Sequence, residues 1–144
     1  MEIIQLEESN LIEIKPLWEQ LNEFHKQKSH NFKKYYARFT FEERMKIIHE
    51  KANFAVFIAK HNEDIVGYTI VSCVKDLGEI DSIFIIPKLR NSGLGKELIK
   101  KAEAWLSGQN ANRIVISVAD GNEAVLPFYQ SLGYLQRLTI LEKT

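Results

Sequence analysis

Two glycines stand two residues apart in the stretch LRNSGLGKEL, residues 89–98, between a basic run and an apolar one. Without a Cβ atom, Gly93 and Gly95 would let a ligand come close to the backbone. If a helix begins here, its first N–H groups lack partners within the helix and are suited to bind phosphate oxygens. The alternative is a tight turn that needs glycine only for its dihedral angles. The surrounding charge favours an anion, because one acid, Glu97, stands among five cations, Lys88, Arg90, Lys96, Lys100 and Lys101.

Two common nucleotide-binding motifs do not fit this stretch. A P-loop needs glycine where Arg90 stands and serine or threonine where Glu97 stands. The dinucleotide motif G-x-G-x-x-G needs a third glycine where Leu98 stands, and the βαβ unit that should open it is absent. Neither class of nucleotide site is therefore expected here.

A second block, NEAVLPFYQSLGY at 122–134, follows the first at a distance. Together with R-x-x-G-x-G at 90–95, it resembles the Gcn5-related N-acetyltransferase (GNAT) family, whose second block reads N-x-x-A-x-x-F-Y-x-x-x-G-F; Tyr134 replaces the final Phe. The resemblance covers roughly residues 54–140. It implies that the glycine loop holds the pyrophosphate of acetyl-coenzyme A (acetyl-CoA), the acyl donor. The implied acetyl-CoA contacts are Phe84, Ile85, Ile86, Arg90, Asn91, Ser92, Gly93, Leu94, Gly95, Lys96, Asn122 and Tyr129.

Transfer of an acetyl group to an amine needs three chemical roles. An alkyl amine with a pKa near 10.4 is protonated at pH 7, so its neutral form costs about 4 to 5 kcal/mol and a base must take the proton. The leaving thiolate benefits from an acid, and the developing oxyanion needs hydrogen-bond donors. The resemblance assigns the acid to Tyr129 and the donors to backbone N–H groups near residues 84–86. Simple packing beside Phe128 is the alternative for Tyr129.

The base has several candidates. Glu79 lies eleven residues before Arg90, the spacing of the glutamate base in the histone-acetylating branch of the family. Asp81 shares its strand face if the strand is regular, and His25 has a suitable intrinsic pKa. The two carboxylates could instead attract a cationic amine or line a solvated strand edge, and His25 could simply be solvated. Asn122 is expected to cap the helix that carries Tyr129, whose start near residue 125 or kink follows from Pro127.

Composition places limits on the function. The chain has 144 residues, 45% of them hydrophobic, and 19 basic residues balance 19 acidic ones, so no global field steers it toward nucleic acid or a charged membrane. No apolar run approaches the ~20 residues needed to span a bilayer, and the N-terminus has no features of a signal peptide. Cys73 lies in an apolar run and reads as a buried structural thiol, and no histidine has zinc-site spacing with it. We expect one domain over 1–144, cytoplasmic, with no metal.

The pattern of apolar residues predicts the elements that position these side chains. It indicates an α+β fold that begins antiparallel and ends with a strand-helix-strand crossover. Residues 28–39 read as a connection, in which Phe32, Tyr35, Tyr36 and Phe39 either line a substrate pocket or attach the loop to the core. The expected strands are 2–6, 54–61, 65–74, 79–87, 113–119 and 134–142, and the expected helices are 11–27, 40–52, 94–106 and 123–132.

Fold and function follow as expectations. The resemblance implies a three-layer GNAT fold with a mixed central sheet of about six to seven strands flanked by about four helices. It also implies an enzyme that moves acetyl from acetyl-CoA to a primary amine by direct attack, on a small molecule such as a polyamine or antibiotic. The alternatives are acetylation of a protein or peptide amine, or a non-catalytic CoA-binding regulatory module. Exposed strands after residue 113 could pair in a homodimer.

Overall fold

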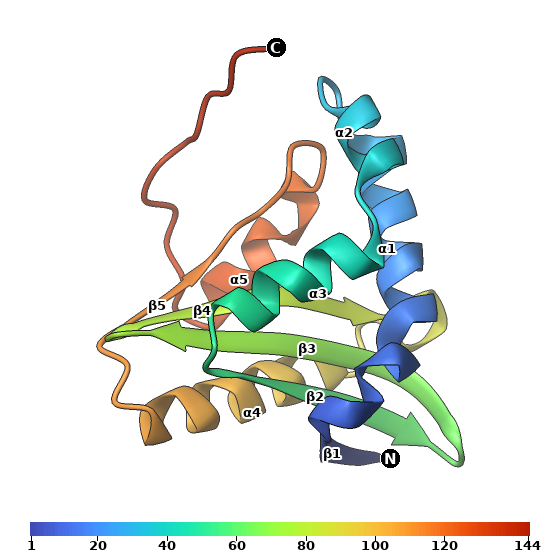
Figure 1. Cartoon of the computed structure of the whole chain (residues 1–144), viewed down its shortest axis with the longest axis vertical. Coiled ribbons are helices and arrows are strands. Elements are labelled where there is room, and N and C mark those ends of the chain that lie inside the picture. The colour runs from blue at the N-terminus through green and yellow to red at the C-terminus, as the bar shows by residue number, and fades with distance from the viewer.

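A mixed sheet of five strands forms the centre of the computed structural model, which describes residues 1–144 (Figure 1). The strands lie in the order β1-β2-β3-β4-β5; the first four are antiparallel to their neighbours, and β5 runs parallel to β4. Their bounds are β1 Glu2–Leu6, β2 Phe54–His61, β3 Asp64–Val74, β4 Leu77–Ile85 and β5 Arg113–Ile116. The expected number of six to seven strands is therefore not reached.

Helices cover both faces of this sheet (Figure 1). On one face α1 and α3 enclose a core with Trp18, Ile48, Tyr68 and Ile70, and on the other α4 encloses a core with Leu98. The α-helices are α1 Lys15–Lys28, α2 Lys33–Arg38, α3 Phe41–Glu50, α4 Leu94–Gly108 and α5 Leu126–Ser131, and short 3-10 turns span Glu8–Ile14, Pro87–Leu89 and Glu123–Val125. None of these helices combines the length and the apolar character needed to cross a bilayer.

The longest helix, α4, confirms its predicted core face. The residues at three- and four-residue spacing, Leu94, Leu98, Ile99, Ala102 and Leu106, are all buried, and Trp105 is packed beside them. Such a stripe buries its side chains on one side only, so α4 lies flat on the sheet. This fixes its N-terminus at the end of the loop that follows β4.

Two irregularities shape the sheet near the expected site. The β2–β3 register shifts beside Gly67, where a Cβ atom would lie 3.2 Å from the Phe84 carbonyl oxygen and 3.4 Å from Leu98, so the expected close approach is confirmed. The β3–β4 register shifts at Asp81, which lies between the paired residues Ile80 and Ser82. This second bulge turns Asp81 toward the same face as Ser82, because a bulge inserts one extra residue.

The N-terminal helices differ in detail from their prediction. The expected helix 11–27 is a 3-10 turn up to Ile14 followed by α1, whose first turn holds Pro16. Thr40 accepts a hydrogen bond from the Glu43 N–H at 3.1 Å, so the predicted start of α3 is confirmed. The expected connection 28–39 contains α2, and Phe39 packs against Trp18 with ring centroids 5.7 Å apart. A six-residue helix leaves too short a periodic pattern to be distinguished from a loop.

The C-terminal prediction was wrong in one element. Residues 134–142 form no strand, and the predicted strand 113–119 ends at Ile116. Alternation of apolar residues predicts a strand, but a strand also needs neighbouring N–H and C=O groups, and residues 135–144 make no hydrogen bond in this structure. Gly133 has φ +94° and ends the preceding helical segment as predicted.

Candidate active site

A gap in the sheet is the first feature of the site. Strand β5 pairs with β4 only from Leu77 to Ile80, so residues 81–85 of β4 have no neighbour on that side. Figure 1 shows β5 running away from β4 beyond this point. The backbone groups of β4 that face the gap are free to bind an extended ligand as a neighbouring strand would.

The direction of the N–H groups along β4 can be assigned. The Ile86 N–H donates to the Val66 carbonyl at 3.0 Å, on the side of β3. Because successive residues of a strand point their N–H groups to opposite edges, Ile85 and Ile83 point theirs into the gap. Of the three residues expected to supply an oxyanion donor, Ile86 is therefore occupied and Phe84 points to β3, which leaves the N–H of Ile85.

The glycine loop joins this strand to α4. Gly93 lies before the first residue of α4 with φ +88°, and no side chain caps the helix there. The N–H groups of Leu94, Gly95 and Lys96 begin the helix and have no carbonyl within it to donate to. The Leu94 side chain is buried, so only its backbone can serve a ligand. The loop therefore presents unpaired donors at the positive end of a 15-residue helix.

The loop side chains are partly engaged with their own loop. Arg90 Nε donates to the Ile85 carbonyl at 3.1 Å, and its guanidinium lies over the Phe84 ring at 5.4 Å. Ser92 Oγ donates to the Leu89 carbonyl, and Asn91 takes a positive φ of 63°. Arg90 is thus held at the edge of the gap, with its terminal nitrogens free of protein partners.

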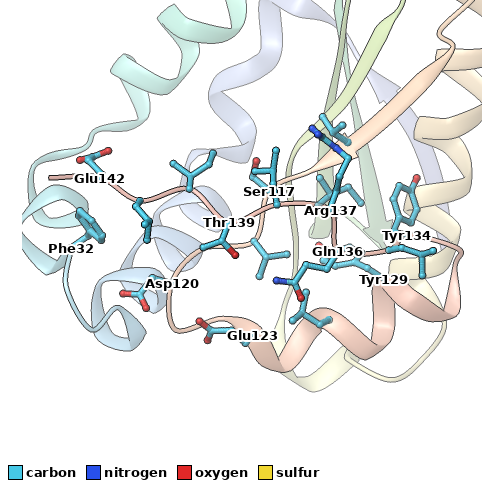
Figure 2. A pocket seen from close by; sticks show the side chains of 18 of the residues that line it. Phe32, Ser117, Asp120, Glu123, Tyr129, Tyr134, Gln136, Arg137, Thr139 and Glu142 are labelled. Carbon is cyan, nitrogen blue, oxygen red and sulfur yellow. The ribbon is translucent and has the colours of Figure 1, made fainter.

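Tyr129 lies where a proton donor would be needed. It projects from α5 beside Tyr134, with ring centroids 6.4 Å apart, and lines a large open space (Figure 2). Its hydroxyl makes no hydrogen bond with the protein, and burial raises the pKa of Tyr129 to about 12. The phenol therefore stays protonated at neutral pH and can donate. As expected, α5 begins near residue 125, because Pro127 occupies its first turn.

The two candidate carboxylates are tied to one cation. Lys51 Nζ lies 3.1 Å from Glu79 Oε1 and bonds to Asp81 Oδ1, while Ser72 Oγ donates to Asp81 Oδ2 at 2.6 Å. The Asp81 side chain is 1% exposed and that of Glu79 is 32% exposed. Burial alone would lower the pKa of Lys51, but the hydrogen bond and charge of Asp81 outweigh it and raise that pKa. Glu79 is therefore the carboxylate that solvent or substrate can reach.

A polar group of side chains lies between the helices and β4. One terminal nitrogen of Arg44 donates to the Asp81 carbonyl oxygen, while Arg44 Nε and His25 Nδ1 are buried without a partner. Burial, and then the nearby Arg44 charge, lower the pKa of His25. His25 is neutral at pH 7 and packs against Tyr36, with ring centroids 5.4 Å apart. These groups offer polar contacts on the helical side of the gap.

An acidic side chain connects the loop before α5 to the loop after α1. Asp120 Oδ2 accepts hydrogen bonds from the Ser29 hydroxyl at 3.0 Å, the His30 N–H at 2.7 Å and the Asn31 N–H at 3.1 Å. Asn122 makes no side-chain capping bond, so the capping role expected for it is wrong. The sequence gives no signal for Lys51, Arg44 or Asp120, because their partners lie 28 to 91 residues away.

The open space beside β5 extends this region. It measures about 2110 Å³ and is bordered by α2, β5, α5 and the C-terminal segment (Figure 2). Asp120, Glu123 and Tyr129 line one side, and Arg137 and Thr139 line the other. The space therefore joins the expected acid to the segment whose expected strand is not formed.

Comparison with known proteins places this fold and site in a class. The description "Acetyltransferase (GNAT) family" matches residues 14–134. The chain belongs to this family. It is 30% identical over 80 residues to an uncharacterised N-acetyltransferase of Chlorobaculum tepidum, covering 54% of this chain and 48% of that protein. It is 28% identical over 112 residues to one of Methanocaldococcus jannaschii, covering 73% and 48%. The chain thus spans about half the length of these curated relatives.

Solved structures agree on the fold. A putative acetyltransferase from Pyrococcus furiosus has a TM-score of 0.74 at 24% identity, covering 99% of this chain and 98% of that one. The aminoglycoside N-acetyltransferase AAC(6')-Iy in complex with CoA has a TM-score of 0.70 at 19% identity, covering 99% of both chains. An aminoglycoside acetyltransferase from an uncultured soil metagenomic sample, in complex with sisomicin, has a TM-score of 0.72 at 20% identity, covering 99% of this chain and 95% of that one. The α+β GNAT fold is confirmed.

Proposed function

We propose that this chain transfers the acetyl group of acetyl-CoA to the primary amine of a small molecule by direct attack. The observation that carries the proposal is the continuity of two features. The unpaired edge of β4 at 81–85 leads directly into the loop whose N–H groups open α4. An extended pantetheine arm fits a free strand edge, and a pyrophosphate fits unpaired helix N–H groups.

The residues present fit acetyl-CoA, which supplies an activated thioester when bound. Gly93 leaves open space in front of the helix, since a Cβ atom there would meet nothing within 4 Å. Arg90 and Lys96 add positive charge beside the free N–H groups. We assign the phosphate contacts to the backbone of residues 93–96 and the support of the pantetheine arm to the edge of β4. Asn122 has no protein partner for its side chain as a cap and remains a contact in this proposal.

The chain's own groups would carry out the proton transfers. Glu79, the accessible carboxylate, accepts the amine proton, directly or through water, because about 4 to 5 kcal/mol would otherwise be needed to reach the neutral amine. The Ile85 N–H donates to a carbonyl oxygen that gains negative charge in the gap. Tyr129 donates its phenolic proton to the departing sulfur, and Asp81 holds Lys51 in place rather than acting as base.

Two observations bear on the acceptor amine. Structures of similar fold include aminoglycoside acetyltransferases, which act on small amines, although identity to them is below 25%. The helical side of the gap is polar, with His25 and Arg44 unpartnered at one nitrogen each. A protein or peptide amine is the alternative within this class, and a CoA-binding module without catalysis is the alternative from another class.

The test is release of free thiol from acetyl-CoA in the presence of a panel of polyamines, aminoglycosides and peptides. An enzyme for small amines should release thiol with members of the first two groups and yield the acetylated amine by mass spectrometry. Acetylation of peptides alone would favour the protein-acetylating alternative. Binding of acetyl-CoA without any turnover across the panel would favour the regulatory module.

A further inference from the structure

The segment 135–144 has strand character but no partner. It makes no hydrogen bond with any other part of the chain. Four of its apolar side chains are among the most exposed in the molecule, with Leu135 83%, Leu138 53%, Ile140 80% and Leu141 91% exposed. Unpaired backbone groups and an exposed apolar run of this kind normally find a partner strand. The segment therefore requires a partner that one copy of the chain does not supply.

A free strand edge lies across from this segment. Strand β5 is the last strand of the sheet, so its outer edge has no neighbour. The edge carries none of the usual protection, since residues 113–118 read RIVISV with a single charge at the start and no proline. Ile114, Val115 and Ile116 are only half-buried. The edge is suited to accept a strand of apolar character.

The distance between the two is filled by open space. Residues 112–118 and 132–142 line the same space of about 2110 Å³ (Figure 2). Pockets for small molecules usually measure about 300 to 1,000 Å³, so this one has the size for a peptide segment. The start of the chain's own segment is fixed, because Tyr134 Oη donates to Glu103 Oε2 at 2.6 Å and its N–H donates to the Tyr129 carbonyl at 3.0 Å.

We propose that residues 135–142 of a second copy of this chain occupy the space and pair with the edge of β5. In a two-fold dimer the exchange is reciprocal. The order across the interface becomes β5, the partner's segment, the chain's own segment, and β5 of the partner. Each C-terminal segment then has a strand on both sides, and the apolar side chains become buried. This proposal does not depend on the acetyl-transfer reaction.

The test is the mass of the full chain in solution by sedimentation equilibrium at micromolar concentration. The wild-type chain should sediment at about twice its mass of 16.7 kDa. Thr139→Pro removes an N–H and Leu138→Asp adds a charge, and neither residue has a hydrogen bond to lose within one copy. Both variants should sediment as monomers with an unchanged circular dichroism spectrum. Ile12→Asp is the matched control, since Ile12 is an exposed apolar residue, 62% exposed, far along the chain, and it should leave the dimer intact.

Hydrogen exchange of residues 135–142 separates the remaining outcomes. Slow exchange in the dimer that becomes fast in Thr139→Pro supports the exchange of segments. A monomeric wild-type chain with slow exchange would show that the segment pairs with its own β5, and fast exchange would show that it stays unpaired; either would overturn the proposal. A dimer that persists in both variants would place the interface elsewhere and overturn it as well.

Discussion

Gly95 lies against Phe128: a Cβ atom built on Gly95 would stand 3.1 Å from Phe128 Cζ and 3.2 Å from Ile85 Cδ1, whereas one built on Gly93 would meet nothing within 4 Å. The two glycines of the loop are therefore present for different reasons. Gly95 lets α5 pack against the start of α4. Gly93 takes a backbone conformation that side chains disfavour and leaves open the space in front of the helix.

Gly95→Ala should destabilise the fold through this contact. The added methyl group crowds Phe128 and Ile85, and overpacking of this kind costs about 1 kcal/mol in the free energy of unfolding, measured by urea titration. In a Phe128→Leu background the same substitution should cost less, because the crowded ring atom is gone. An equal cost in both backgrounds would show that the contact does not limit residue 95.

Tyr129→Phe should lower kcat at least tenfold with little change in the affinity for acetyl-CoA, because it removes the proposed proton donor and keeps the ring. Tyr134→Phe is the matched control: it removes a neighbouring hydroxyl, bonded to Glu103, and should keep kcat within about twofold. Unchanged turnover in Tyr129→Phe would exclude the phenol as the acid.

The pH dependence of kcat tests the same group. Burial raises the pKa of Tyr129 to about 12, so the phenol remains protonated and able to donate up to about pH 11. The kcat profile should therefore show no alkaline decline from this residue between pH 7 and 10. A decline with an apparent pKa near 10 that disappears in Tyr129→Phe would contradict the assignment.

Glu79 and Asp81 should respond differently to loss of charge. Glu79→Gln should lower kcat/KM with little effect on stability, because its carboxylate is accessible and is proposed as the base. Asp81→Asn leaves Lys51 as a buried cation without its short ion pair, and loss of one member of such a pair costs about 3 to 5 kcal/mol in the free energy of unfolding. A stable, inactive Asp81→Asn variant beside an active Glu79→Gln variant would assign the base to Asp81 instead.

The Asp120 contact should weaken at low pH. Burial acts to raise the pKa of Asp120, but hydrogen bonds from the Asn31 and His30 N–H groups and the Ser29 hydroxyl outweigh it and lower that pKa. Its stabilisation is thus complete above the ordinary aspartate pKa of about 4 and is lost as the pH falls through the lower folded value. Asp120→Ala should speed hydrogen exchange at the amides of residues 30 and 31 at neutral pH. Unchanged exchange would show that other contacts hold this loop.

The sequence predicted elements whose signals are local. The spacing of Leu94, Leu98 and Ala102 defines a helix face regardless of distant residues, and Thr40 with Glu43 marks a helix start within one turn. The glycine loop and Tyr129 were found because two short motifs resemble those of a known family. Their roles stay a prediction until binding and turnover are measured.

Features that depend on distant partners were missed. Lys51 follows α3 and becomes part of the site only because β4 brings Glu79 and Asp81 to it. Asp81 shares the face of Glu79, but the bulge at this position could not be read from residue types. The alternation in residues 134–142 predicted a strand without showing what would pair with it. In each case the deciding contact comes from another part of the chain or, as we propose, from another copy.

Calorimetric titration with acetyl-CoA, CoA and ATP tests the central claim most directly, because it needs no knowledge of the acceptor amine. The account predicts micromolar binding of acetyl-CoA and CoA, weaker binding of ATP, and loss of binding in Gly93→Ala. Gly133→Ala is the matched control, since Gly133 also has a positive φ, +94°, with nothing within 4 Å of a Cβ atom, and it should bind normally. A folded wild-type chain that binds neither acetyl-CoA nor CoA would contradict the account.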